Sequence, residues 1–577
     1  MRASSLLKWM VVLTALSLHG FCDATEERGK VTQKLLGRLT GKPMHIIRST
    51  TPDGCHVAVL LSTEKKLVVS IDGKSGPEFD EILDGSLVYG PGGKRVVYAG
   101  RRGDRWVAVV DGQPGPEFEA LGSIAFSADG KHYGYAALRD GKASVVVDGQ
   151  PGPEYDGVGA ESPFFSSDGE RVAYVAAKNG KYLAVVDGQP HPEYDLIGEG
   201  TVVFSADGKH LAYAAQKAGK WYMVVDGEPG PEHEGFAKGD PVFSPDGNRM
   251  AYRAVKGDKW TVIVNGQAGP EYDAIGKGTL LFSFDGKRIA YTAKKGAKWV
   301  VVVDGKQGPE YDGIAKGDPK FSPDGKHFFY SAEENGKWTV VADDEPGPNY
   351  AIIAERTPFY SPDGGRPAYV AKKADKWLVV IDGLCGPEFD GIAEGTPVFS
   401  ADGKRIAYSA NRGGKYQVVI DGNSDSEWDS IGSGGMIFSP DGRRFAYMAA
   451  KDGKWFAVID GKPGPGFDRF AEGSLTFSVD GSRVMYGASL GATWTMVIDG
   501  KPGPEYDNLL KGILVMSTDG KRVAYGARKN GKEFVVIDGK VGPKCDAIAA
   551  VPVFLKDGSL EYIAVKGDEL YCITHRP

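Results

Sequence analysis

Hydrophobic residues occur along this chain in short runs that are separated by glycine, proline and aspartate. The stretch from Leu280 to Gly317 shows the pattern: LLFSFDGKRIAYTAKKGAKWVVVVDGKQGPEYDGIAKG. Its runs are rich in Val, Ile, Tyr, Phe and Trp, the residues that strands favour. The pattern predicts four strands, which we call a, b, c and d: Leu280 to Ser283, Lys287 to Ala293, Trp299 to Asp304 and Glu310 to Ile314.

The turns in this stretch have the residues that tight hairpins require. Asp285-Gly286 can adopt the positive φ angles of a hairpin turn, so the chain should reverse between strands a and b. The run from Val300 to Val303 has no polar alternation, which is typical of a strand covered on both faces. One unit of this size buries at most one face of its sheet, so it must stack on copies of itself.

Copies of the unit fill the chain. The aspartate of the a–b turn recurs every 39 residues, at Asp129, Asp168, Asp207, Asp246, Asp285, Asp324, Asp363, Asp402, Asp441, Asp480 and Asp519. Less regular members at Asp53, Gly92 and Asp557 bring the total to fourteen units. This period is close to the ~40–45 residues of a propeller blade and does not fit helical solenoids. The sequence therefore predicts an all-β protein, a β-propeller of fourteen four-stranded blades.

The number of blades bears on how they close. Single rings usually hold ~4–8 blades, so two seven-bladed rings are the simplest partition, with residues 25–313 in the first and residues 314–577 in the second. The last unit stops after its third strand, at Tyr571 to Thr574. We expect the segment from Val31 to Thr40 to supply the missing outer strand.

The motif F-S-x-D-G-K-x-x-A-Y recurs, for example from Phe204 to Tyr213 and from Phe399 to Tyr408. The repeats therefore resemble the WD40-like propeller repeats of the TolB type. This resemblance implies the propeller fold and leaves the function open, because such repeats occur in binding proteins, in envelope assemblies and beside hydrolase domains. The chain lacks the separate α/β domain that precedes the propeller of TolB, so the resemblance does not imply a TolB role.

The N-terminal residues have the pattern of a secretory signal. Arg2 and Lys8 precede an apolar stretch that is too short to span a bilayer, and Ala24 suits cleavage. We expect residues 1–24 to be removed and the mature protein to be secreted or periplasmic, with no membrane-spanning segment. Cys55, Cys545 and Cys572 could then form a disulfide, or stay as buried thiols. The formal net charge of -7 gives no reason to expect nucleic-acid binding.

Lysines gather in the turns between strands b and c, where they would favour an anionic partner if they lay on one rim. The candidate partner-binding residues are Lys217, Lys220, Lys256, Lys259, Lys294, Lys295, Lys298, Lys372, Lys373 and Lys376. The alternative is that these lysines only keep the turns solvated.

Two further repeated features have structural explanations. An aromatic residue opens strand c in most units, as at Trp299, and could stack on sugars or bases, but packing between blades is the more usual role. The loop motif PGPEYD brings Glu310 close to Asp312, but two carboxylates per loop are too few for a calcium site. We expect no metal and no cofactor.

The sequence favours an exported, non-enzymatic propeller that binds a protein or an anionic cell-envelope polymer in a scaffolding role. One alternative is a lyase or hydrolase that acts on a polysaccharide in a propeller channel, and another is a structural component of a secreted matrix. The enzyme would gain support if the irregular residues Asn349, Arg356, Asp425 and Glu427 converged at one site. The segment from Gly487 to Gly491 matches G-x-S-x-G, but it falls in a hairpin and lacks the strand-to-helix turn that a nucleophilic serine needs.

Overall fold

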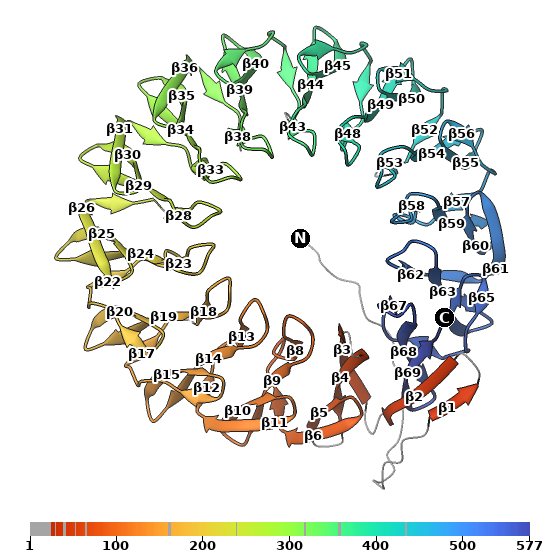
Figure 1. Cartoon of the computed structure of the whole chain (residues 1–577), viewed down its shortest axis with the longest axis horizontal. Coiled ribbons are helices and arrows are strands. Elements are labelled where there is room, and N and C mark those ends of the chain that lie inside the picture. The colour runs from red at the N-terminus through yellow and green to blue at the C-terminus, as the bar shows by residue number, and fades with distance from the viewer. Residues whose placement is uncertain are drawn as a thin grey trace. The chain divides into compact units, whose positions relative to one another are not determined.

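The computed structural model of the chain describes residues 25–28, 31–38, 42–51, 54–63, 66–159, 163–237, 239–316, 319–355, 359–432 and 435–577. These residues form strands and turns without any helix, and the strands make fourteen small antiparallel sheets (Figure 1). The predicted fold class, an all-β propeller of fourteen blades, is confirmed. The signal-peptide prediction falls on residues 1–24, which lie outside the described residues.

We number the blades in sequence order. From first to last strand residue they occupy 42–79, 81–118, 120–151, 157–190, 196–233, 235–272, 274–311, 313–346, 352–385, 391–424, 430–463, 469–506 and 508–541, and blade 14 combines 547–575 with 25–38.

Blade 7 shows how the predicted strands map onto the sheet. Its strands are β32 (Ala274–Ile275), β33 (Leu281–Phe282), β34 (Ile289–Lys295), β35 (Lys298–Val303) and β36 (Lys306–Tyr311). The inner strands β32 and β33 both pair with β34, which pairs with β35, which pairs with β36.

The prediction for strand d was wrong in one respect. The segment predicted as Glu310 to Ile314 is divided between two sheets, because Tyr311 pairs with Trp299 of its own blade whereas β37 (Gly313–Ile314) pairs with β39 (Phe328–Glu334) of blade 8. The chain leaves blade 7 in this way, through a two-residue strand of the next blade, and it leaves blade 12 through the longer β62 (Asn508–Met516). This exchange links successive blades by backbone hydrogen bonds.

Aspartate and glycine residues set the c–d turns. Asp304 and Gly305 have φ angles of 51° and 77°. Glycine adopts this conformation without steric cost, and aspartate tolerates it better than most residues. The tight turn holds β35 and β36 in register, with Val303 opposite Lys306.

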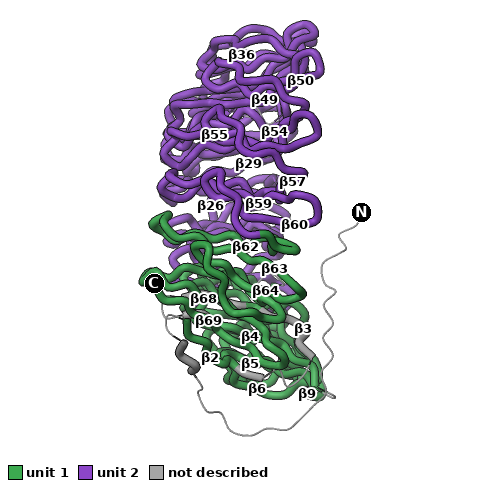
Figure 2. The backbone as a smooth tube through the Cα atoms, turned by 90° about the vertical axis from the view of Figure 1, so that its right-hand side faces the viewer, with its two compact units in different colours: residues 1–165, 172–176, 505–577 green, residues 166–171, 177–504 purple. Residues whose placement is uncertain are grey.

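The chain divides into two compact units (Figure 2). Unit 1 comprises residues 1–165, 172–176 and 505–577, and unit 2 comprises residues 166–171 and 177–504. In unit 2, Tyr311 and Tyr330 belong to one buried cluster that spans blades 7 and 8. The predicted boundary between residues 313 and 314 lies inside this unit, and the partition into two seven-bladed rings stays a prediction.

Both ends of the chain contribute to one sheet in unit 1. Strand β2 (Val31–Arg38) pairs with β69 (Glu569–His575), and β1 (Thr25–Arg28) pairs with β2. The prediction that Val31 to Thr40 supplies the outer strand of the last unit is confirmed. Within this sheet, Leu36 and Cys572 belong to a core cluster that also includes Val57 of blade 1.

Two further predictions concern membranes and thiols. In the described parts of the chain, no helix has the length and apolarity of a membrane span. Cys385 and Cys545 form no disulfide within the described residues, and the side chain of Cys55 lies outside them. Cys545 is buried and donates a hydrogen bond from its thiol to the Pro543 carbonyl oxygen at 3.4 Å. A disulfide between Cys55 and either C-terminal cysteine stays untested.

Candidate functional site

Successive blades meet where the c–d loop of one blade lies over a buried tyrosine of the next. The junction between blades 11 and 12 is typical: a Cβ atom added to Gly464 would lie 3.5 Å from the hydroxyl oxygen of Tyr486 and 3.3 Å from the Ala457 carbonyl oxygen. Glycine lets the loop approach the tyrosine closely. In two loops another residue occupies this position, His191 after blade 4 and Asp425 after blade 10.

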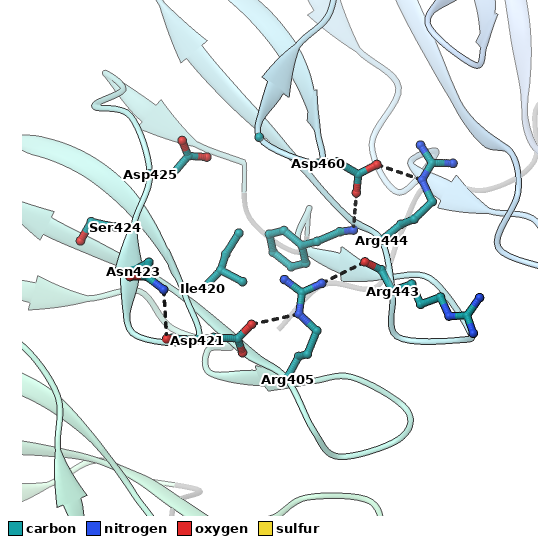
Figure 3. Close-up of a pocket in the computed structure, with 11 residues that line it drawn as sticks. Arg405, Ile420, Asp421, Asn423, Ser424, Asp425, Arg443, Arg444 and Asp460 are labelled. Carbon is teal, nitrogen blue, oxygen red and sulfur yellow. Dashed lines mark hydrogen bonds and ion pairs between the residues drawn. The ribbon is translucent and has the colours of Figure 1, made fainter.

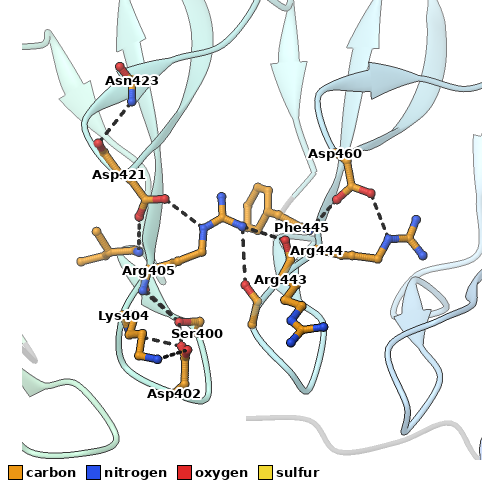
Figure 4. A network of polar contacts seen from close by, with 12 residues as sticks. Ser400, Asp402, Lys404, Arg405, Asp421, Asn423, Arg443, Arg444, Phe445 and Asp460 are labelled. Atoms are coloured by element: carbon orange, nitrogen blue, oxygen red, sulfur yellow. Dashed lines mark hydrogen bonds and ion pairs between the residues drawn. The ribbon is translucent and has the colours of Figure 1, made fainter.

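An arginine joins successive blades beside this contact, as at the junction of blades 10 and 11 (Figure 4). In blade 10, Arg405 donates from Nε to Asp421 at 2.9 Å and from Nη1 to the carbonyl oxygen of Arg443 in blade 11 at 3.0 Å. Asp421 also accepts the backbone N–H of Ile406 at 2.9 Å. The guanidinium lies over the ring of Phe438, with 5.3 Å between its central carbon and the ring centroid. Arg405 therefore holds the c–d turn of its own blade against the a–b turn of the next.

The a–b turn of blade 10 is held in shape by a serine and an aspartate. Ser400 donates its hydroxyl to Asp402 at 2.6 Å and accepts the backbone N–H of Arg405 at 3.0 Å. Asp402 also accepts the backbone N–H of Lys404 at 3.2 Å, and these bonds keep its pKa below the ordinary value for aspartate. The motif F-S-x-D-G-K thus encodes a rigid turn that places Arg405 at the junction.

A cavity opens at the junction of blades 10 and 11 (Figure 3). We call this cavity of 720 Å³ the Asp425 cleft. On one side lie Ile420, Asp421 and the loop from Asn423 to Asp425, and on the other lie Arg443, Arg444, Phe445 and Asp460. The loop follows β50 (Lys415–Ile420) and β51 (Asn423–Ser424), and Phe445 begins β54 (Phe445–Lys451).

The cleft is open because the loop departs from the repeat. In blade 11 the equivalent loop reads Lys462-Pro463-Gly464-Pro465, whereas in blade 10 it reads Asn423-Ser424-Asp425-Ser426. The change removes two proline rings from the wall of the cleft and adds one carboxylate.

Asp425 reaches the buried tyrosine that glycine covers elsewhere. It accepts the hydroxyl of Tyr447, and Tyr447 in turn accepts a hydrogen bond from the Trp428 indole at 3.2 Å. Burial raises the pKa of Tyr447 above its ordinary value, and the bond to the carboxylate raises it further. Asp425 is half-buried and also accepts the backbone N–H of Ser426 at 2.6 Å. It makes no ion pair with any described residue.

The other carboxylates of the cleft are committed to structural bonds. Asp421 is paired with Arg405, and Asp460 accepts Nε of Arg444 at 2.9 Å and the backbone N–H of Phe445 at 3.0 Å. The cleft therefore contains one carboxylate that has no cation beside it.

A second cavity occupies the equivalent junction of blades 5 and 6. It measures 440 Å³ and is lined mainly by apolar groups, including Met223, Val225 and Met250, together with the prolines of the loop Pro229-Gly230-Pro231. At this junction His210 takes the place of the arginine and contacts Asp226 through Nδ1 at 2.7 Å. The regular proline loop thus accompanies a smaller and more apolar cavity.

The ten predicted lysines lie in the b–c hairpins, at the opposite end of the blades. Five of them pair with carboxylates: Lys256 with Glu271, Lys259 with Asp273, Lys295 with Glu310, Lys298 with Asp312 and Lys376 with Asp390. Lys372 lies over the Trp377 ring, and Lys217, Lys220, Lys294 and Lys373 make no ion pair with the described residues. Their role in binding an anionic partner stays a prediction.

The acidic loop motif explains part of this pairing. Asp312 accepts Nζ of Lys298 in blade 7 at 2.6 Å and the backbone N–H of Asn335 in blade 8 at 2.9 Å. The lysine and this N–H both lower the pKa of Asp312. This lysine–aspartate clamp recurs at other junctions, so the final aspartate of PGPEYD connects blades.

The aromatic residue that opens strand c packs between blades at Trp221, Trp377 and Trp455, whereas Tyr182 is exposed. Trp455 is partly buried against a cluster that contains Phe467, which follows blade 11 in the chain, and Tyr486 of blade 12. No group of His, Cys, Asp and Glu residues suited to a metal ion occurs in the described residues.

The irregular residues do not gather at one site. Asp425 lines the cleft, whereas Glu427 is exposed and contacts the side-chain amide of Gln417 at 3.4 Å, and Asn349 lies in a loop before blade 9. Arg356 lies outside the described residues. Ser489 of the G-x-S-x-G segment is buried in β59 (Val484–Leu490) and pairs with Trp494 across a hairpin, as predicted.

Comparisons with known proteins identify propellers at low similarity. No family model matches the chain, and no curated protein matches it. The matching solved structures include TolB from Acinetobacter baumannii, at 17% identity and a TM-score of 0.18, with 45% of this chain and 77% of that chain covered.

They also include the β-propeller domain of the Trilobed protease from Pyrococcus furiosus and the Dos1 propeller. The first has 15% identity and a TM-score of 0.23, with 46% of this chain and 96% of that chain covered. The second has 11% identity and a TM-score of 0.22, with 59% and 93% covered. The structural neighbours thus include β-propellers, TolB among them, whereas no sequence family is identified for this chain.

Proposed function

We propose that the protein is an exported, non-enzymatic binding module of the cell envelope that binds a protein partner through the a–b and c–d turns of unit 2. The β-propeller fold is consistent with a protein-binding module. The a–b and c–d turns share one end of each blade, because the first residues of strand b pair with the last residues of strand c, as Ala290 does with Val303. We call this end of the blades in unit 2 the turn face.

The observation that carries the proposal is the exposure of three large apolar side chains on this face, in blades 7, 9 and 12. Phe284 is 70% exposed, Leu384 75% and Val479 58%. Phe284 and Val479 occupy the a–b turn position that is Pro323, Pro362 or Ala401 in other blades. Exposed apolar and aromatic side chains are typical contacts of surfaces that a partner covers.

The chemistry of the cleft supports a binding role over catalysis. Hydrolysis of a glycosidic bond generally requires two carboxyl groups placed on either side of that bond. Asp421 and Asp460 each hold an arginine and a backbone N–H, so Asp425 is the only carboxylate in the lining with no such cation. One carboxylate can orient a bound group, but it does not supply an acid and a base.

An anionic envelope polymer on the b–c turns is the second candidate partner. The observation in its favour is that Lys217, Lys220, Lys294 and Lys373 lack ion pairs among the described residues. Pairing of the other lysines reduces the local positive potential, so we favour the protein partner on the turn face.

Site-specific photocrosslinking in the cells that make the protein tests the proposal. A benzoylphenylalanine is placed at Phe284 or Leu384 on the turn face and, as a matched control, at Lys373 in a b–c turn. We expect one and the same polypeptide to be captured from positions 284 and 384, and not from position 373. Capture from position 373 alone, or from none of the three, would contradict the proposal.

A further inference from the structure

We propose that the Asp425 cleft binds the cationic side chain of a lysine or arginine from the polypeptide partner. This inference rests on the proposed function and specifies what the turn face recognises.

The charges in the cleft lead to this proposal. Asp421 and Asp460 are neutralised by Arg405 and Arg444, each at 2.9 Å. The remaining cation, Arg443, is 86% exposed in its side chain, pairs with Asp441 at 3.7 Å and extends away from Asp425 (Figure 3). Asp425 is therefore the one carboxylate in the cleft whose charge no described cation balances.

Asp425 also has room for further hydrogen bonds. A carboxylate has about four acceptor positions. Tyr447 and Ser426 each donate one hydrogen bond to Asp425, to different oxygens. An ammonium or guanidinium group that enters the cleft can thus donate to the free positions without displacing Tyr447. Such charge-assisted hydrogen bonds are stronger than neutral ones.

The shape of the cleft suits a long side chain with an apolar stem. Ile420 and Phe445 line the cavity beneath the loop, and serines stand where the regular loop has prolines. Phe445 is buried, so the methylene groups of lysine or arginine can pack on the half-buried Ile420 while the charged end meets Asp425.

A neighbouring loop favours a polypeptide over a free amine. Leu384 occupies in blade 9 the loop position that Asn423 occupies in blade 10, and it is 75% exposed. A partner that lies across both loops meets an apolar position and then an acidic one. A half-exposed ion pair alone contributes little affinity, so the apolar contact is needed.

Binding of small probes to the purified full-length protein tests this inference by saturation-transfer NMR. The probes are N-acetyl-lysine N-methylamide, its norleucine counterpart, which lacks the ammonium group, and cadaverine, which lacks the peptide groups. We expect the lysine probe to bind about threefold more tightly than the norleucine probe, which is the effect of one half-exposed ion pair. We expect cadaverine to bind more weakly than the lysine probe.

Variants locate the binding. Asp425→Gly restores the residue of the regular loop, Asp425→Asn removes only the charge, and Glu427→Gln is a control at a neighbouring exposed carboxylate. We expect the first two to lose the preference for lysine over norleucine, and Glu427→Gln to keep it, with similar unfolding midpoints for all. Retention of the preference in Asp425→Gly would overturn the proposal, and cadaverine binding as tightly as the lysine probe would overturn the assignment to a polypeptide.

The two proposals can fail separately. If the photocrosslinks at positions 284 and 384 form but persist unchanged in Asp425→Gly and the lysine preference is absent, the binding function stands and the cationic site does not. If no polypeptide is captured at these positions, the proposed function fails, whatever the probes show.

Discussion

Two adjacent junctions, between blades 10 and 11 and between blades 11 and 12, have the same backbone arrangement and different chemistry. In both, an arginine pairs with the aspartate of its c–d turn and donates to a carbonyl oxygen of the next blade, Arg405 to Arg443 and Arg444 to Ser482. The loops differ, because Asp425 bonds Tyr447 in the first junction whereas Gly464 covers Tyr486 in the second. The comparison teaches that the repeat determines where the blades meet, and single loop residues determine what the junction can recognise.

The largest expected difference between the junctions concerns their buried tyrosines. Tyr447→Phe leaves the Trp428 indole without its acceptor and removes one of the two hydrogen bonds to Asp425, which should cost about 2 kcal/mol of unfolding free energy. The hydroxyl of Tyr486 has no hydrogen-bond partner among the described residues, so Tyr486→Phe should be neutral or slightly stabilising. Denaturant unfolding of the two variants measures this difference. Equal destabilisation by both would contradict the hydrogen-bond network assigned to Tyr447.

Exchange of the loop residues should change stability less. The backbone at Gly464 does not require glycine, since its φ angle is not positive, and an aspartate there can accept the Tyr486 hydroxyl. We expect Gly464→Asp and Asp425→Gly each to shift the unfolding free energy by no more than about 1 kcal/mol. A loss of several kcal/mol in Gly464→Asp would show that the two junctions are not equivalent in backbone.

His191 extends the comparison to a residue that titrates near neutral pH. It occupies the same loop position and contacts the Tyr213 hydroxyl through Nδ1 at 3.3 Å. Burial lowers the pKa of His191 below its ordinary value of 6.5. Because the unfolded chain then binds the proton more readily, stability should fall as pH decreases below about 6.5. His191→Gly should reduce this dependence, as measured by unfolding midpoints between pH 7.5 and pH 5, and an unchanged pH profile would contradict the contribution of His191.

The smallest difference is expected at the opposite end of the blades. Asp429 and Asp468 have the same clamp partners, Lys415 with the N–H of Asp452 and Lys454 with the N–H of Gly491. In each case the lysine and the N–H lower the pKa of the aspartate. The stability that these carboxylates contribute is present above the unfolded pKa of about 3.9 and is lost as pH falls through their lower folded values.

Asp429→Asn and Asp468→Asn should therefore change the acid unfolding midpoint in the same direction and by similar amounts. A large effect at only one of the two positions would show that the clamps are not equivalent. Such a result would mean that the difference between the junctions extends beyond the loop at Asp425.

The blades and most of their strands could be predicted from the sequence. The 39-residue spacing and the Asp-Gly turns predicted the blades, because these features depend on local backbone preferences. The strand count of the unfinished last unit predicted the pairing of Val31 to Thr40 with the C-terminal strand. The division of predicted strand d could not be predicted, since Gly313-Ile314 pairs with a strand of the next blade that no local pattern identifies.

The site was harder to predict for a similar reason. The sequence marks Asp425 as irregular. Its loop reads Asn-Ser-Asp-Ser in place of Lys-Pro-Gly-Pro, and this difference is the signal from which the cleft could be predicted. Its partner Tyr447 is 22 residues away in another blade, and the packing that brings them together is tertiary. Five of the ten candidate lysines pair with carboxylates of strand d or of the loop after it, a pairing that depends on blade geometry.

Transfer of the loop from blade 10 to blade 11 tests whether the loop residues determine what a junction recognises. The first chain has Ser424→Pro, Asp425→Gly and Ser426→Pro, which restore the regular loop in blade 10. A second chain also has Lys462→Asn, Pro463→Ser, Gly464→Asp and Pro465→Ser in blade 11. There the native residues Ile459 and Val484 occupy the positions that Ile420 and Phe445 occupy beside the cleft. The account predicts that the preference for the lysine probe over the norleucine probe is lost in the first chain and regained in the second. If the first chain keeps the preference, or if the second chain folds natively and lacks it, the loop residues do not determine what the junction recognises.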